Sequence, residues 1–315
     1  MSLSSSERPA ARGAAATGTC TNLAAALAEP LAGSAAVAGT WLCLEQRGPW
    51  GHDAARQSHL DPSVGDKLAA RAEAVGARLQ LIRDVGPHPD KPGPRRAYLA
   101  HTRPERCWLR QADLDDPAEL LDLDLDEAAR GSHGGWGRSA AGPLLLVCTN
   151  GRRDRCCAMR GRALLAEVGE PPAGSIWETS HTGGHRFSPT GVLLPSGYTY
   201  GRLDPANARA ALAAAAEGEV VLDGCRGRSA WSGAGQAAEL AVREKLGEHE
   251  LNALRVGTSE NGRVEVLHED GRGWLVTVRR EELDPRPTSC GTQPSSPCAY
   301  VADEITEHPR CPGSS

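Results

Sequence analysis

The sequence lacks long apolar runs and has few aromatic residues. Aromatic side chains make up 4% of its 315 residues, with a single Phe, so aliphatic side chains must fill the core. No run approaches the length of a membrane-spanning helix, and residues 1–19 lack the apolar segment of a signal peptide. We therefore expect no membrane partner and a cytoplasmic location.

The chain also lacks a basic excess. It contains 35 Lys and Arg residues against 40 Asp and Glu residues, which gives a formal net charge of −5. A nucleic-acid-binding surface needs a basic excess or a basic stripe. We therefore expect no nucleic acid among the partners of this protein.

The apolar residues, 40% of the chain, are numerous enough for two or three compact domains. Their spacing predicts a strand, a helix and further strands, followed by a second unit in the order β-α-β-β-β-α. This second unit matches a thioredoxin-like layer. The fold class that we predict is α/β, with a thioredoxin-like domain between a small α/β layer and a helix plus β-hairpin segment.

The predicted boundaries follow from these patterns and from stretches rich in Pro, Ser and Gly. Asp204 is the expected N-cap of a helix at 206–216. The parts are a disordered N-terminus (1–19), an N-terminal α/β domain that is itself a candidate thioredoxin-like unit (20–140), the thioredoxin-like domain (141–224), a C-terminal helix with strands (225–284), and a mostly flexible tail with one short strand near Tyr300 (285–315).

The ten cysteines are unusual for a chain of this length. Without a signal segment, cysteines are more typical of metal ligands or redox groups than of a disulfide framework. Seven of them lack recognisable ligand spacing, and we interpret these as buried or tail thiols: Cys20, Cys43, Cys107, Cys225, Cys290, Cys298 and Cys311. The other three lie close together and need a separate explanation.

These three cysteines occupy positions where a loop or helix start can present a thiol. Cys148 directly follows an apolar strand at 143–147. Cys156 and Cys157 fall at the start of a predicted helix, where free backbone amides and the helix dipole favour a thiolate. An adjacent Cys pair can also be ordinary buried packing.

Two histidines follow at close spacing. His181 and His185 flank Gly183 and Gly184, and the glycines predict a tight loop rather than a helix, because glycine lets the backbone approach a cofactor closely. Thiols and imidazoles are the ligands that select iron–sulfur clusters, zinc or copper. The combined pattern favours a metal site over a purely structural role.

With these motifs the chain resembles the sucrase/ferredoxin-like family, whose domain is a thioredoxin-like ferredoxin. The resemblance runs from about Cys20 to Leu283. It is carried by the segments CTNGRRDRCC (148–157), WETSHTGGHRF (177–187), LPSGYTYGR (194–202) and RGRSAWSGAGQ (226–236).

The resemblance implies a [2Fe–2S] cluster bound by two Cys and two His. Carried over by position, the metal ligands are Cys148, Cys157, His181 and His185. Adjacent residues do not normally point the same way, so we expect Cys156 to pack beside the site, and it is the alternative ligand. Many relatives have His where this chain has Asn150, so no role is assigned to that side chain.

The implied function is electron transfer, with a redox carrier expected rather than a catalyst. No G-x-G-x-x-G fingerprint opens a helix after a strand, so electrons must come from a protein redox partner. Arg152, Arg153 and Arg186 flank the site, either to dock an acidic partner or as ordinary solvated charges. Two neutral imidazoles in place of two thiolates predict a potential above that of a plant-type ferredoxin.

Two other functions stay open. Two Cys and two His also form a closed tetrahedral zinc set, which predicts a structural zinc-binding interaction protein. A thiol-based thioredoxin-like oxidoreductase would use Cys156 or Cys157 as its nucleophile, although the chain lacks a Cys-x-x-Cys motif.

Overall fold

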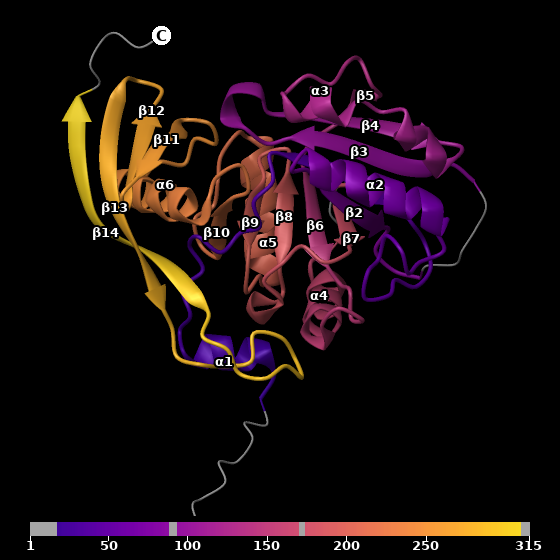
Figure 1. Ribbon diagram of the computed structural model, residues 1–315, viewed down its shortest axis with the longest axis horizontal. Coiled ribbons are helices and arrows are strands. Elements are labelled where there is room, and N and C mark those ends of the chain that lie inside the picture. The colour runs from indigo at the N-terminus through magenta and orange to yellow at the C-terminus, as the bar shows by residue number, and fades with distance from the viewer. Residues whose placement is uncertain (1–17, 88–92, 170–173, 310–315) are drawn as a thin grey trace, which may run out of the picture.

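Two β-sheets organise the chain in the computed structural model, which describes residues 18–87, 93–169 and 174–309 (Figure 1). One sheet has ten strands and the other has four. The mixed α/β class predicted from the sequence is confirmed. The predicted disordered N-terminus lies outside the described residues, apart from Gly18 and Thr19.

The ten-stranded sheet has the strand order β10-β9-β8-β6-β7-β2-β1-β3-β4-β5. Most of its strands coincide with the apolar runs from which strands were predicted. Their bounds are β1 (Thr40–Glu45), β2 (Arg78–Arg83), β3 (Arg95–His101), β4 (Trp108–Leu114), β5 (Arg138–Ser139), β6 (Leu144–Cys148), β7 (Ile176–Thr179), β8 (Gly191–Leu194), β9 (Tyr198–Tyr200) and β10 (Cys225–Arg228).

The two halves of this sheet repeat one topology. In the first half β1 pairs parallel with β2 and antiparallel with β3, which pairs antiparallel with β4. In the second half β6 pairs parallel with β7 and antiparallel with β8, which pairs antiparallel with β9. The halves join where β2 and β7 run antiparallel, so one sheet continues across the predicted boundary near residue 140.

Helices cover the faces of the sheet. In the contacts between elements, α2 packs on β2, α4 on β6, and α5 on β6 and β8. The predicted N-cap Asp204 is confirmed, because its carboxylate accepts a hydrogen bond from the amide of Asn207 at 2.8 Å. The helices are α1 (Cys20–Ala26), α2 (Pro62–Ala74), α3 (Leu125–Ala129), α4 (Arg155–Glu167), α5 (Pro205–Ala216) and α6 (Gly233–Leu246), with short 3₁₀ turns η1 (Pro104–Arg106), η2 (Pro117–Leu121) and η3 (His185–Phe187).

The core joins both halves of the large sheet. β6 is buried along its whole length, which agrees with its continuous apolar sequence. Trp41 and Tyr98 from the first half belong to the same buried cluster as Leu146 and Trp177 from the second. The two α/β units therefore share hydrophobic contacts as well as backbone hydrogen bonds.

The C-terminal part forms the four-stranded antiparallel sheet, against which α6 packs. The short strand predicted near Tyr300 is part of a twelve-residue strand that pairs with β13 from Arg272 to Glu282, so the tail is more ordered than expected. The pairing partner is the preceding strand, but composition alone does not indicate which strands pair. The strands are β11 (Leu254–Glu260), β12 (Arg263–His268), β13 (Arg272–Glu282) and β14 (Cys298–Pro309).

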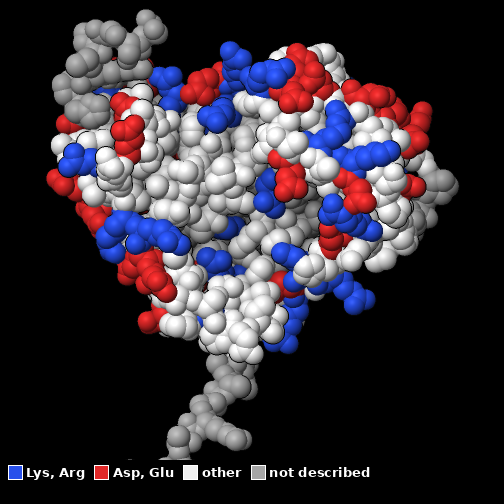
Figure 2. All heavy atoms as spheres, in the orientation of Figure 1, with Lys and Arg blue, Asp and Glu red and all other residues white. Residues whose placement is uncertain are grey.

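The surface carries both signs of charge. Lys and Arg side chains are interspersed with Asp and Glu side chains over the described part of the face in Figure 2. Within the described ranges, every helix is too short or too polar to cross a membrane.

Candidate metal centre

The first cysteine segment is shaped by a loop between β6 and α4. Cys148 is the last residue of β6 and is fully buried. The side chain of Asn150 accepts hydrogen bonds from the amides of Arg152 and Arg153 at 3.2 and 3.3 Å, and it donates to the carbonyl of Gly51 at 3.2 Å. Asn150 therefore holds the turn that leads into α4, a structural role that the sequence had left unassigned.

The helix start places the two adjacent cysteines in different surroundings. Asp154 caps α4, and its carboxylate accepts a hydrogen bond from the amide of Cys156 at 2.8 Å. The thiol of Cys157 lies near Cys148 and His181, and the three ligand atoms lie within 4.8 Å of one another. Successive helical residues project in different directions, so Cys156 points elsewhere.

The histidine loop places His185 beside this group, but the set of ligand atoms that lie within 4.8 Å of one another includes only His181 of the two histidines. The rings of His181 and His185 are 5.1 Å apart between centroids. Gly183 and Gly184 have φ angles of 95° and 72°, so the predicted tight loop is confirmed. The Nδ1 atoms of both histidines are buried, and neither has a hydrogen-bond partner among the described residues.

Donors from distant segments hold this loop in place. The loop carbonyls of His181, Gly183 and His185 each accept a hydrogen bond from elsewhere in the chain. Arg78 of β2 donates to the first at 3.1 Å, and Arg226 of β10 donates to the second at 3.0 Å. Thr21 of α1 donates to the third at 3.2 Å. The position of the imidazoles thus depends on three separate parts of the fold.

The electrostatics of the group favour one thiolate and a neutral imidazole. A hydrogen bond from Cys157 holds the pKa of Cys148 well below its usual value, against the opposing effect of burial, and the same contact raises the pKa of Cys157. Burial lowers the pKa of His185. A thiolate and a neutral imidazole are the protonation states in which these side chains bind metals.

A buried arginine, Arg226, and a half-buried one, Arg78, lie beside the group. Burial, aided by the charge of Arg186, lowers the pKa of Arg226 to about 9, so its guanidinium still carries a charge at neutral pH. Burial also lowers the pKa of Arg78. Two positive charges therefore lie near the thiols, in a part of the protein where water does not screen them fully.

The flanking arginines singled out in the sequence differ from one another. Arg152 and Arg153 are exposed, and a ring nitrogen of His52 lies 2.9 Å from the guanidinium of Arg153. Arg186 is mostly buried and forms an ion pair with Glu29 at 2.7 Å. Arg186 therefore has a structural partner, whereas the other two project into solvent.

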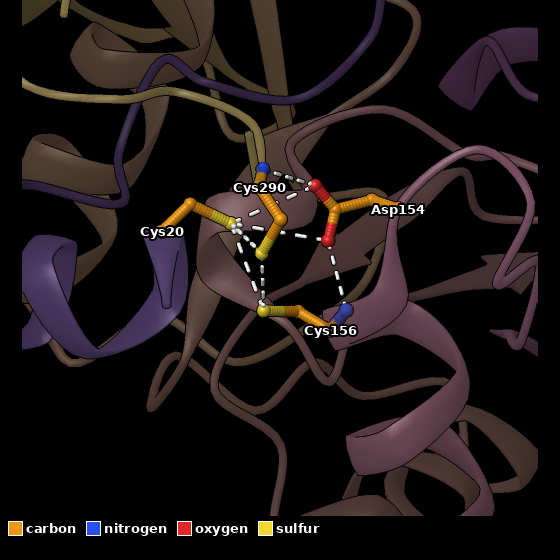
Figure 3. A group of neighbouring side chains, drawn as sticks. All are labelled: Cys20, Asp154, Cys156 and Cys290. Carbon is orange, nitrogen blue, oxygen red and sulfur yellow. Dashed lines mark hydrogen bonds between the residues drawn. The ribbon is translucent and has the colours of Figure 1, made fainter. Parts of the chain in front are cut away.

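A second group of thiols was missed. Cys20 is buried and Cys290 lies in the tail, as expected, but both also lie against Cys156, which the sequence did not indicate (Figure 3). They come from positions that are 134 to 270 residues apart, so no local motif marks them. Of the other five, Cys43 and Cys225 are buried, Cys107 and Cys298 are half-buried, and Cys311 lies outside the described residues.

Comparison with known proteins identifies the family. No curated protein and no solved structure matches the chain. The family model described as sucrase/ferredoxin-like matches residues 31–227, which include both the thiol segment and the histidine loop. Since the match spans more than half of the chain, the protein belongs to the sucrase/ferredoxin-like family.

Proposed function

We propose that the protein transfers electrons through a [2Fe–2S] cluster bound by Cys148, Cys157, His181 and His185. The observation that carries the proposal is the pair of buried Nδ1 atoms, on His181 and His185, that have no hydrogen-bond partners among the described residues. His181 lies beside two buried thiols, and its ring is 5.1 Å from that of His185. A buried polar atom left unpaired costs about 1–3 kcal/mol, so both imidazoles are better explained as ligands. Iron–sulfur clusters accept thiolate and imidazole together.

The surrounding residues suit a carrier of electrons. The cluster, when bound, supplies a one-electron couple. Arg78 and Arg226 place positive charge near it, and two neutral imidazoles replace two thiolates, so both features stabilise the more negative reduced state. We expect a reduction potential above the value of about −400 mV that is typical of plant-type ferredoxins.

We include in this proposal the thioredoxin-like character of the two α/β units. The repeated strand order of the two halves supports a pair of thioredoxin-like units, of which the second carries the ligands. The exposed Arg152 and Arg153 are suited to docking an acidic redox partner. The cytoplasmic location and the identity of that partner stay predictions.

The test is to purify the protein without oxygen and measure iron, acid-labile sulfide and the visible spectrum. We expect a red-brown protein with roughly two irons and two sulfides per chain. A colourless protein with one zinc bound at these four residues would overturn the proposal and favour the structural zinc alternative.

The adjacent cysteines provide a matched pair of variants. Cys157→Ser should lose most of the iron, whereas Cys156→Ser should keep it, because only the thiol of Cys157 faces Cys148. His181→Cys and His185→Cys should keep a cluster but lower its potential, since each adds a negative charge to the ligand set. Equal iron loss in the two Ser variants would refute the assignment.

A further inference from the structure

The second thiol group gathers three segments of the chain. Cys20 begins α1, Cys156 lies in the first turn of α4, and Cys290 belongs to the segment between β13 and β14. Figure 1 shows that segment, in yellow, beside α1. The Sγ atom of Cys290 lies 3.2 Å from that of Cys156 and 3.5 Å from that of Cys20, and the Cys20–Cys156 distance is 3.7 Å.

A carboxylate lies on the fourth side of this group (Figure 3). The two side-chain oxygens of Asp154 lie 3.7 and 3.9 Å from the Sγ atom of Cys20. The side chain of Asp154 is completely buried. Four metal-binding side chains thus surround one point, while Cys20 and Cys156 are each only 1% exposed.

These distances match the edges of a tetrahedron around one ion. A Zn–S bond of about 2.3 Å and a Zn–O bond of about 2.0 Å imply S–S edges of about 3.8 Å and S–O edges of about 3.5 Å. The three S–S distances and the S–O distances to Cys20 lie within about 0.6 Å of these values. A disulfide would need a separation of about 2.05 Å, and an iron–sulfur cluster would spread three cysteines over several irons.

We propose that Cys20, Cys156, Cys290 and Asp154 bind a single zinc ion in a structural site. Thiolates are soft ligands that select zinc over magnesium or calcium, and four protein ligands leave no open position for a substrate. The site does not depend on the [2Fe–2S] assignment, because it shares no ligand with it.

The carboxylate is already oriented for this role. Its Oδ1 atom accepts hydrogen bonds from the amide of Cys156 at 2.8 Å and from the thiol of Cys20 at 3.9 Å. The thiol loses its proton when it binds a metal, so one lone pair of Oδ1 is then left for the ion. Its Oδ2 atom accepts from the amide of Cys290 at 2.8 Å and from the hydroxyl of Ser289 at 2.9 Å. Such supporting hydrogen bonds fix the direction of a metal-binding carboxylate.

Nearby positive charge offsets the charge of the ligands. The group lies at the N-terminus of α4, where the helix dipole favours anions. The side chain of Arg155 interacts with Cys290 and is exposed.

The ion would join both ends of the chain to the flank of the first site. Cys20 and Cys290 both lie outside residues 31–227, so the family match does not include them. Thr21, next to Cys20, holds the carbonyl of His185, and Asp154 Oδ2 is 3.9 Å from the Nε2 atom of that histidine. The zinc would thus anchor α1 and the segment before β14 against the histidine loop.

The test measures zinc and iron per chain in protein purified without chelators from cells supplied with zinc. We compare the wild type with Cys20→Ser, Cys290→Ser and a control, Cys298→Ser, which alters a half-buried cysteine outside both groups. We expect about one zinc per chain in the wild type and the control, and a loss of about tenfold or more in the other two variants. X-ray absorption spectroscopy at the zinc edge should show that the ion is bound by three sulfur atoms at about 2.3 Å and one oxygen atom at about 2.0 Å.

The outcomes separate this site from the first. Cys148→Ser should lower the iron content but leave the zinc content unchanged, so failure of the cluster assignment does not affect the zinc result. The proposal is overturned by wild-type protein with less than a tenth of a zinc per chain, or by zinc that persists in both Cys20→Ser and Cys290→Ser. A Cys156–Cys290 disulfide in the purified protein would also overturn it.

Discussion

The histidine loop gives a sharp prediction, because its two adjacent glycines differ in what surrounds them. Both Gly183 and Gly184 have positive φ angles, at 95° and 72°. An alanine at either position costs about 1–2 kcal/mol in backbone strain. A Cβ atom on Gly183 would make an ordinary contact with Ala36 at 3.6 Å, whereas one on Gly184 would lie 2.6 Å from the Cζ atom of Arg226.

The guanidinium of Arg226 cannot move aside without loss. It is 1% exposed and donates to the Ser34 hydroxyl and the Gly183 carbonyl, at 3.0 Å in each case, and to the Ser34 carbonyl. Loss of one hydrogen bond from a charged group costs about 1.5–3 kcal/mol. Gly184→Ala should therefore destabilise the protein by about 2.5–5 kcal/mol, and Gly183→Ala by about 1–2 kcal/mol.

Urea unfolding followed by far-ultraviolet circular dichroism measures the difference, and the iron content of each variant shows whether the loop still holds its histidines. We expect Gly184→Ala to lose iron as well as stability. Equal free energies of unfolding for the two variants, within about 0.5 kcal/mol, would refute the role given to Arg226.

Three further predictions concern other parts of the fold. Glu29→Gln removes the buried carboxylate that pairs with Arg186 and Arg286, and it should lower the free energy of unfolding by about 3 kcal/mol or more. Glu105→Gln, at an exposed ion pair, should change the free energy of unfolding by less than about 1 kcal/mol. Similar urea midpoints for the two variants would contradict this. Asp204→Ala should cost about 1 kcal/mol through loss of the α5 N-cap, and Asp204→Asn should restore most of it in the same assay. Burial raises the pKa of Cys225 to about 12, so its contribution to stability is complete below the unfolded thiol pKa near 9 and is lost as the pH rises toward 12. Cys225→Ala should flatten the decline in stability between pH 9 and 11 by up to about 1.4 kcal/mol per pH unit, and an unchanged slope would count against that pKa.

Local sequence patterns were sufficient for features whose cause is local. The alternating apolar pattern of Arg78–Arg83 predicted β2 with the bounds that the structure has. The N-cap role of Asp204 and the tight loop at Gly183 and Gly184 follow from the conformational preferences of single residues, and both are confirmed. The start of a helix at the paired cysteines was likewise readable from neighbouring residues.

Features that depend on distant segments were decided only by the tertiary structure. Only a short strand near Tyr300 was predicted in the tail, because the hydrogen-bond partners of β14 in β13 leave no mark on its own composition. From the sequence, Arg186 could be an ordinary solvated charge, but in the folded chain it donates a hydrogen bond to Glu29, which is 157 residues away. Contacts of this kind arise from how the sheet and its connections fold, not from periodicity along the chain.

The two proposed metal sites differ in the same way, because the first lies in local motifs and the second depends on the tertiary structure. The residues proposed for the first site lie in two short motifs, so the resemblance of the sequence to its family could bring Cys148, Cys157, His181 and His185 together as one hypothesis. The second site takes Cys20, Cys156 and Cys290 from positions up to 270 residues apart. Only the packing of α1 and the segment before β14 against the start of α4 turns those separate thiols into a set of ligands, because a metal ion requires donors that are close in space and not in sequence.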